Sequence, residues 1–365
     1  MLSKSSRRLR FFALVMGVVL LAVPLILMWV PEAPEAGPLC SGKPLQARFD
    51  ENGLLPLPPV RTDYWQYQGM ILWAGGRDGE LIKYDTNSGL VELCRNFGAG
   101  FTINSIFGWK ESIWVALDAG DAGGGVWEYV LKTQQWIEHS VATEELLDDR
   151  TYCLVPSTDG DTLYICTIAG ISQIYRGAGV APEPFQLPPD NVVNFHDIEP
   201  FPNGEVWLCS IKDGVYTHQN GLWTHFNSKG VQTWNSSSKK WISVLDKPVV
   251  SDKCRDLQLM FDGYIGIAGD ASENALVFIP LNVQDFSAQV SPEFKNLTSI
   301  TLGPSGEELQ RGYAVTDYLG GAYFVNFQGD KILVTDIESN DSAWVSTGDF
   351  YFATQKGIVR YHVPQ

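Results

Sequence analysis

The residues of this 365-residue chain that could do chemistry are polar or charged side chains at the starts of short apolar runs. The set comprises Asp63, Asn104, Arg150, His196, Asp197, Arg255 and Asp256, together with Asn296. His196 and Asp197 are its one adjacent His–carboxylate pair, and such groups can serve as acid, base or metal ligand. Neighbouring residues of a strand point to opposite faces, so we do not expect the two to act together. Polar capping of a strand is the plainer role for His196.

Loops between the apolar runs offer further carboxylates, and none predicts a metal or cofactor site. These are Asp78, Asp118, Asp121, Asp270 and Glu273. The loop 116–125 has two acids among glycines, whereas calcium requires more oxygen ligands at defined spacing. His218 and His225 flank a predicted hairpin turn, and we expect both to be surface residues. The motifs G-x-S-x-G, H-E-x-x-H and the P-loop do not occur in the sequence.

The elements that must position these residues are strands, because one strand pattern recurs seven times. Each copy is an apolar strand, a turn, a strand centred on Trp or Tyr, and in most copies a Gly and another aromatic strand. The centres are Trp73, Trp114, Trp207, Tyr164, Tyr264, Tyr313 and Tyr351. They lie 38 to 57 residues apart, and a four-stranded propeller blade needs about 40–50 residues. The sequence therefore predicts an all-β, seven-bladed β-propeller over residues 44–365.

In such a ring the first strand of each blade lines the central channel. Its start lies on the same face as the loop between the second and third strands, so seven loops converge there. The polar residues named above would then gather at the mouth of the channel. We expect a ligand site there.

Two segments require separate assignments. The seventh unit has three strands before Gln365, and the alternating segment 45–51 is free to supply the missing outer strand. Such a closure removes an exposed sheet edge. The segment 229–244 has the pattern of an additional hairpin and explains the longest spacing, 57 residues.

The first 43 residues predict a membrane anchor. Residues 11–30 carry no charge, and a helix of this length spans about 30 Å, the thickness of a bilayer core. The tail 1–10 contains four basic residues, which places it in the cytoplasm and the remainder of the chain outside. Residues 31–43 are rich in Pro and Gly and form a spacer. A cleaved signal peptide is the alternative, but the apolar run is longer than usual and lacks a good cleavage site.

The charge of the exported part limits its partners. The whole chain carries −16, and residues 31–365 carry −20 because the first 30 residues contribute four bases and no acid. This argues against nucleic acid and anionic lipid as ligands.

Six cysteines in an exported chain suggest disulfides. Cys153 and Cys166 are equidistant from a predicted turn and would lie opposite each other in a hairpin. A Cys40–Cys94 pair could tie the spacer to the first blade. The alternative is that Cys166 and Cys209 are small apolar core residues at equivalent positions of their blades.

The repeat units resemble those of a known family. EVWLCSIKDGVYTHQNGLWTHF (205–226) and FYFATQKGIVRYH (350–362) are similar to the propeller repeats of two-component regulator sensor proteins. This resemblance covers most of 60–365 and implies a seven-bladed module that senses a ligand or partner. PFPNGEVWL (200–208) and FDGYIGIA (261–268) are similar to repeats of streptogramin lyase propellers, but no matching His–Glu–His set is present.

These observations favour a membrane-anchored propeller outside the cytoplasm that binds a small ligand or an envelope protein, without a cofactor. The alternative is an envelope lyase or hydrolase with its site in the channel mouth. A cluster of His and carboxylates within hydrogen-bonding reach at the mouth would favour the enzyme.

Overall fold

The computed structural model describes residues 45–46, 48–56, 60–66, 70–76, 78–189, 192–260, 263–270, 274–281, 289–291, 294–303, 312–326, 328–345 and 348–364. The chain divides into two units, Met1–Leu39 and Cys40–Gln365, and every described residue belongs to the second. For residues 60–66, 70, 290 and 345 the structure describes the backbone alone.

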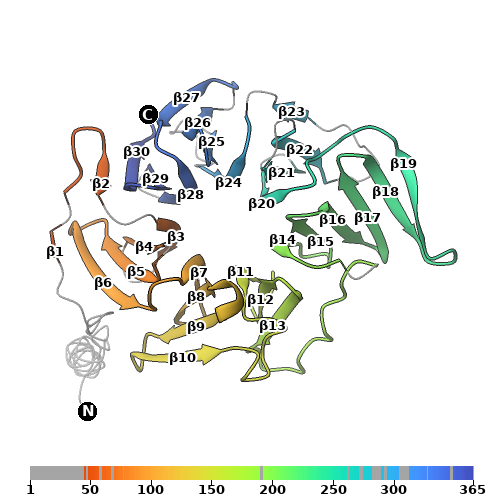
Figure 1. Ribbon diagram of the computed structural model, residues 1–365, viewed down its shortest axis with the longest axis horizontal. Helices are drawn as coiled ribbons and strands as arrows, with labels where there is room; N and C mark the ends of the chain where they lie inside the picture. Colours follow the sequence, from red (N-terminus) through yellow and green to blue (C-terminus); the bar gives the residue numbers. More distant parts are fainter. Residues whose placement is uncertain are drawn as a thin grey trace, which may run out of the picture. The chain divides into compact units, whose positions relative to one another are not determined.

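The described strands form seven antiparallel sheets arranged as blades around a ring (Figure 1). The fold is therefore an all-β, seven-bladed propeller, as the repeat predicts. Blade one contains β3 (Val60–Gln66), β4 (Met70–Gly76), β5 (Glu80–Asp85), β6 (Leu90–Asn96) and β1 (Leu45–Gln46), listed from the channel outward. Blade two contains β7 (Thr102–Trp109), β8 (Ser112–Asp118), β9 (Gly124–Val130) and β10 (Gln135–His139), with the 3-10 turn η1 (Gly120–Ala122) between β8 and β9.

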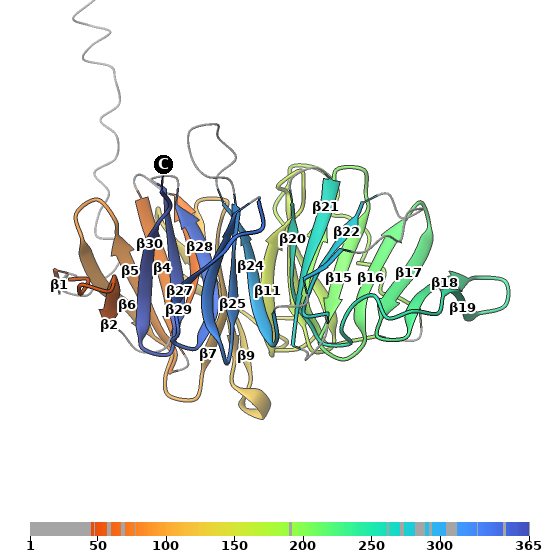
Figure 2. The same ribbon diagram turned by 90° about the horizontal axis from the view of Figure 1, so that it is seen from above.

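Besides blade one, which has the additional short strand β1, the third and fourth blades depart from the four-stranded plan. Blade three has three described strands, β11 (Thr151–Pro156), β12 (Thr162–Thr167) and β13 (Gly170–Tyr175). Blade four has six, β14 (Phe195–Pro200), β15 (Val206–Ser210), β16 (Gly214–Gln219), β17 (Leu222–Asn227), β18 (Gly230–Asn235) and β19 (Lys240–Leu245). The last two form the hairpin predicted over 229–244, and they extend outward from the ring (Figure 2).

The remaining blades have four strands each. Blade five contains β20 (Cys254–Leu259), β21 (Tyr264–Gly269), β22 (Leu276–Pro280) and β23 (Gln289–Ser291). Blade six contains β24 (Leu297–Leu302), β25 (Gly312–Asp317), β26 (Gly321–Asn326) and β27 (Lys331–Thr335). Blade seven contains β28 (Ser339–Val345), β29 (Asp349–Thr354), β30 (Gly357–His362) and β2 (Leu54–Pro56).

The core lies between the blades, because both faces of each sheet are covered by a neighbour. Trp114 of blade two packs with Leu154 and Leu163 of blade three, and Trp207 of blade four packs with Ile265 of blade five. Tyr351 of blade seven packs in the same way against blade one. The aromatic residue of the second strand thus supplies much of the apolar surface that holds adjacent blades together.

The ring closes through a different strand from the one that the sequence predicted. Segment 45–51 does not complete blade seven, because Leu45 and Gln46 pair with β6 of blade one. The outer strand of blade seven is β2, which pairs with β30 from Leu54 to Pro56. A turn separates the two strands: the Asp50 carboxylate accepts hydrogen bonds from the backbone N–H groups of Asn52 and Leu54, at 2.9 Å each. The chain therefore reverses after 51, and the apolar Leu54–Leu55 pair reaches the last blade.

Two described disulfides strengthen the ring. Cys153 and Cys166 are joined across the hairpin of β11 and β12, with a Cα–Cα distance of 4.9 Å, as the turn position predicted. Cys209 is joined to Cys254, so the interpretation of Cys209 as a plain core residue is wrong; this bond links blades four and five. Cys94 is also disulfide-bonded, whereas Cys40, its predicted partner, lies outside the described residues.

The predicted tail 1–10, anchor 11–30 and spacer 31–43 also lie outside the described residues. Within the part that the structure describes, no helix has the length and apolar character needed to cross a membrane.

Closure by β2 can be tested with two leucines of the same N-terminal segment. Leu55 is 5% exposed and packs in the cluster between blades seven and one, whereas Leu45 is 70% exposed. Leu55→Ala should lower the free energy of unfolding by about 2–4 kcal/mol, because it removes a buried side chain and leaves a cavity. Leu45→Ala should change it by less than about 0.5 kcal/mol. Denaturant unfolding midpoints provide the measurement, and equal midpoints for the two variants would contradict closure by β2.

Candidate functional site

Six of the seven innermost strands share a local irregularity. Where each pairs with the second strand of its blade, the register shifts by one residue, which is a β-bulge. β3 of blade one pairs with β4 without such a shift. The residues skipped in the six registers are Asn104, Tyr152, His196, Arg255, Thr298 and Asn340. A bulge redirects a side chain, so six blades in succession present one residue each in an equivalent way.

These six side chains line one cavity of about 240 Å³ in the channel. Three of them, Arg255, Thr298 and Asn340, also line a second cavity of about 390 Å³ at the loops of blades five and six. Asp270, Asn296, Tyr318 and Leu319 complete the second cavity. The two cavities therefore share a wall, and the second is a mouth of the channel.

Some predicted site residues lie in this region and others do not. Asn104, His196 and Arg255 are bulge residues, and Asp197 and Asp256 follow the bulges and line the same cavity. Arg150 lies away from the cavity lining: its Nε donates to Asp148 at 3.1 Å. The side chain of Asp63 and all of Glu273 lie outside the described residues.

The sequence missed Tyr152, Thr298 and Asn340. The turns that join the first two strands differ in length, so the number of residues between the bulge residue and the aromatic centre varies among the blades. An alignment of the innermost strands by their apolar residues, and not by the aromatic centres, would have revealed the shared position.

Polar side chains of the innermost strands bind the backbone of the next blade. Asp197 Oδ2 of blade four accepts a hydrogen bond from Leu257 N of blade five at 2.8 Å. Asp256 Oδ2 of blade five accepts one from Ile300 N of blade six at 2.7 Å. Asn104 of blade two donates to the carbonyl oxygen of Thr151 in blade three at 2.8 Å. An innermost strand has one edge without a strand partner, and these bonds satisfy its backbone groups.

Asp197 and Asp256 also hydrogen bond to each other, which requires a proton between their carboxyl groups. Removal from water raises the pKa of both, and repulsion between the two carboxylates raises that of Asp256 further. Glu199 lies in the same cavity lining, and burial together with the charge of Asp256 raises its pKa to about 7. The channel between blades four and five therefore holds carboxyl groups that retain protons near neutral pH.

His196 contacts an aromatic side chain of the neighbouring blade. Its ring stacks on Tyr152 of blade three, with the centroids 4.2 Å apart and the planes within 14°. The stacked pair gives the polar cavity an aromatic wall.

The mouth contains a cation with an unused donor. Arg255 Nη2 donates to Asp270 Oδ2 at 3.1 Å, and Lys253 Nζ lies 3.6 Å from the same oxygen. Arg255 Nε is buried and has no hydrogen-bond partner among the described residues. A buried unpaired donor costs free energy, which a ligand with an acceptor oxygen would recover.

The two histidines of blade four each stack on an aromatic ring of the same blade. His218 stacks on Trp223, with the centroids 4.7 Å apart, and His225 stacks on Tyr216 at 4.1 Å. His225 is buried, so the expectation of a surface residue is wrong there; its Nε2 contacts the Asp213 carbonyl oxygen. Among the described residues, no group of three His, Cys, Asp or Glu side chains is arranged to hold a metal ion.

Comparison with known proteins identifies the fold. No family model matches the sequence, and no curated protein matches it. The extracellular domain of a B. thetaiotaomicron protein, described as a putative one-component system, superposes with a TM-score of 0.56 and 15% identity. It covers 89% of this chain, which spans 42% of that one. A streptogramin B lyase superposes with a TM-score of 0.57 and 11% identity, covering 85% of this chain and 94% of the lyase. These likenesses show the fold alone.

The carboxyl pair predicts an unusual dependence of stability on pH. A carboxyl whose folded-state pKa is raised stabilises the fold most below its unfolded pKa of about 4, and that stability is lost as pH rises through the folded-state value. Asp256→Asn retains an oxygen for Ile300 N and removes the repulsion. The variant should therefore gain stability relative to the wild type between pH 5 and pH 8, by about 1–2 kcal/mol.

Urea unfolding at both pH values measures this gain. Asp78→Asn, on an exposed turn, is the matched control and should show no pH-dependent gain. The interpretation fails if the difference between Asp256→Asn and the wild type is the same at pH 5 and pH 8.

Proposed function

We propose that this protein is a membrane-anchored, extracytoplasmic propeller that binds a small polar ligand at the mouth of its channel and acts as a binding or scaffold module of the cell envelope. The observation that carries the proposal is the set of six bulges, which direct six side chains from consecutive blades into one cavity. Bulges are typical of places where a side chain must be re-aimed.

The chemistry of the mouth favours a ligand with an oxyanion and further hydrogen-bonding groups. Arg255 offers a buried Nε donor that no described group uses, while Asn296, Asn340 and Thr298 supply neutral polar groups around it. A carboxylate is a suitable partner, because the guanidinium group presents its donors in a planar fork.

The likeness to an extracellular domain supports a ligand-binding module outside the cytoplasm. The uncharged run 11–30 and the basic tail before it support an anchor that retains the propeller at the cytoplasmic membrane. An envelope protein that contacts the rim of the propeller around the mouth would detect whether the ligand is bound.

A lyase or hydrolase is the second candidate, favoured by the fold shared with streptogramin B lyase and by the protonated carboxyl groups in the channel. Acid/base catalysis uses groups whose pKa lies near neutral pH. Asp197 and Asp256, however, already accept hydrogen bonds from the backbone of the next blade. Their pKa values thus have a structural explanation, and we place binding first.

Ligand binding can be tested by thermal shift with a panel of small mono- and dicarboxylates and neutral sugars. At least one carboxylate should raise the melting temperature of the wild type. Arg255→Gln should weaken its binding by tenfold or more, since the charge-assisted hydrogen bonds are lost. Lys229→Gln, at an exposed turn of blade four, is the control and should bind as the wild type does. A carboxylate that binds the wild type and Arg255→Gln equally well would place the site elsewhere.

Anchoring can be tested by fractionation of cells that express the whole chain. The full-length protein should remain with the membranes after a carbonate wash, because about 20 apolar residues stay in the bilayer. N-terminal sequencing of the washed fraction should find the chain uncleaved. Release of a protein that begins near residue 37 would overturn the anchor.

A further inference from the structure

Blade three has an outer edge that the described part of the chain leaves unpaired. In each of the other six blades, the third strand from the channel is covered by a further strand, namely β6, β10, β17, β23, β27 or β2. β13 pairs with β12 alone. An unpaired strand edge is a template for another strand.

The backbone groups of this edge can be assigned from one hydrogen bond. Arg176 N donates to Asp161 O at 2.9 Å, just beyond the β12–β13 ladder. Antiparallel ladders alternate, so every second residue back from Arg176 faces β12. The N–H and C=O groups of Ile171, Gln173 and Tyr175 therefore face away from β12, toward the place of a fourth strand.

The chain after β13 cannot fill this place. The Arg176 guanidinium donates two hydrogen bonds, both of 2.6 Å, to the buried carboxylate of Glu128 in blade two. The segment that follows contains Pro182, Pro184, Pro188 and Pro189, which have no N–H group to donate to a ladder. Phe185 then packs edge-on against Tyr164, with the centroids 5.7 Å apart. The segment is thereby held beside the blade and is not added to it.

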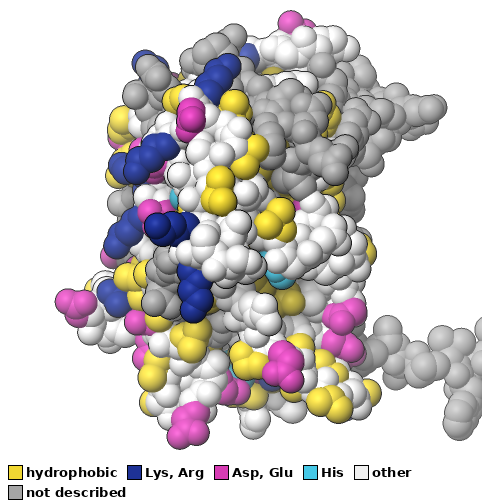
Figure 3. Space-filling model, turned by 90° about the vertical axis from the view of Figure 1, so that its right-hand side faces the viewer, with side chains coloured by type: hydrophobic (Ala, Val, Ile, Leu, Met, Phe, Trp, Pro, Cys, Tyr) yellow, Lys and Arg dark blue, Asp and Glu magenta, His cyan; other side chains and the backbone are white. Residues whose placement is uncertain are grey.

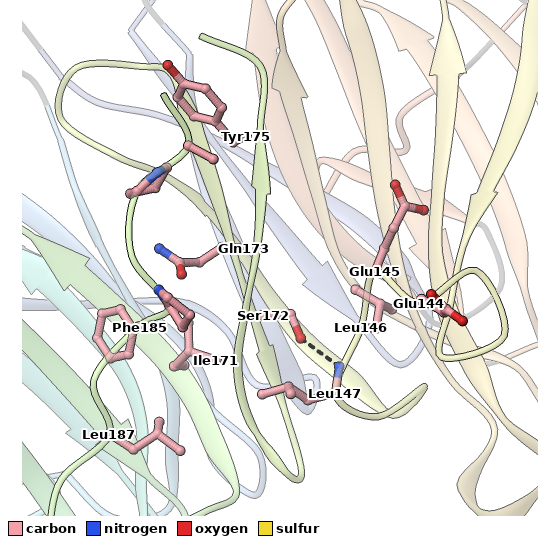
Figure 4. A pocket seen from close by; sticks show the side chains of 13 residues that line it. Glu144, Glu145, Leu146, Leu147, Ile171, Ser172, Gln173, Tyr175, Phe185 and Leu187 are labelled. Atoms are coloured by element: carbon pink, nitrogen blue, oxygen red, sulfur yellow. Dashed lines mark hydrogen bonds between the residues drawn. The ribbon is translucent and has the colours of Figure 1, made fainter. Parts of the chain in front are cut away.

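A groove of about 420 Å³ lies along the edge (Figure 4). Its apolar walls come from Leu147 on one side and from Phe185 and Leu187 on the other. Its charged lining residues are Glu144 and Glu145, and it has no Lys or Arg among its lining. An occupant should thus be an extended strand with apolar and basic side chains.

A strand of this kind lies at the outer edge of blade four. β19 is the last strand of its sheet, and the hairpin of β18 and β19 extends clear of the ring (Figures 1 and 2). Ile242 is 47% exposed and Val244 is 49% exposed. Lys239 and Lys240 are exposed at its tip.

The surroundings of this hairpin are basic, although the chain is acidic overall. Residues 212–253 contain six lysines, all exposed, and three aspartates, in a chain of net charge −16. Figure 3, which faces the side of the ring where blade four lies, shows Lys and Arg side chains gathered on one half of that face. Blade four therefore complements the acidic groove in charge as well as in backbone conformation.

We propose that β19 of one copy of this protein pairs with the edge of β13 in a second copy and so completes blade three. The apolar side chains of β19 would contact the groove walls, and its lysines would lie against Glu144 and Glu145. The two surfaces differ, so the contact is head-to-tail, and a dimer retains one free groove on one copy and one free hairpin on the other for further copies. This association is separate from ligand binding at the channel mouth.

The test is sedimentation velocity of the full-length chain in a mild detergent over a hundredfold range of concentration. The wild type should form dimers and larger species as concentration rises. Gln173→Pro removes the central outward N–H of the edge and leaves the residues that face β12 intact, so it should be monomeric throughout. Gln173→Ala keeps that N–H and should associate as the wild type does.

The hairpin has its own variant, Ile242→Glu, which places a charge where an apolar contact is expected. Alone it should be monomeric, because its hairpin cannot enter an acidic groove. An equimolar mixture of Gln173→Pro and Ile242→Glu should form heterodimers and nothing larger, since each copy retains the surface that the other lacks. The synthetic peptide SSKKWISVLDK (237–247) should dissociate the wild-type assembly.

Several results would overturn the proposal. The first is a wild type that remains monomeric at every concentration. The second is association that persists in Gln173→Pro. The third is a mixture of the two variants that forms no heterodimers. If Gln173→Pro does not fold, amide hydrogen exchange of the wild type decides. The N–H groups of Ile171, Gln173 and Tyr175 should exchange at least tenfold more slowly in the concentrated than in the dilute sample, and unchanged exchange would reject the contact.

Discussion

The structure depends on how each sheet edge satisfies its backbone hydrogen-bonding groups. A blade has an inner edge at the channel and an outer edge at the rim. Unpaired N–H and C=O groups at an edge cost free energy when they are buried, and they can pair with other strands when they are exposed. In the described blades the inner edges are satisfied mainly by side chains. On the outer side, the third strand of six blades is covered by a further strand or hairpin, whereas β13 of blade three is covered by nothing in the described chain.

The treatment of the inner edges explains the character of the channel. A side chain that accepts or donates across to the next blade must be polar, so the same residues that join the blades make the channel polar. Asp197 and Asp256 show the cost, because two carboxyl groups brought together for Leu257 N and Ile300 N must share a proton. The bulge residues beside them, such as His196 and Arg255, remain oriented toward the cavity. The residues that join neighbouring blades and the residues of the candidate site therefore occupy adjacent positions of the same strands.

The sequence predicted the features that depend on local pattern. The seven aromatic centres gave the number of blades, the turn at Asp159 gave the Cys153–Cys166 bond, and the segment 229–244 gave the hairpin. These elements form between residues that are close in the chain. The Cys209–Cys254 bond was missed because its cysteines are 45 residues apart and meet only when two blades pack.

The candidate site was predicted in part. Asn104, His196 and Arg255 were found because they begin strands, but the bulges that orient them depend on pairing registers, which leave little trace in composition. The closing strand was assigned to 45–51 because that segment alternates apolar and polar residues. β2 has three residues and includes a proline, so its pattern is too short to recognise; its position follows from the turn at Asp50 and the burial of Leu55.

Pairing between β2 and β30 also sets the order of events during synthesis. About 300 residues separate the two strands, so at roughly 5–20 residues per second the ribosome takes about 15–60 s to make the second after the first. During that interval the nascent chain holds successive blades without a completed circle, and Leu55 lacks the blade-seven residues of its cluster. β2 belongs to blade seven but is made first, so it must remain unaggregated until β30 emerges from the ribosome. A chain that stops before Gly357 would expose the unpaired edge of β29, which marks it for chaperones and proteases as incomplete.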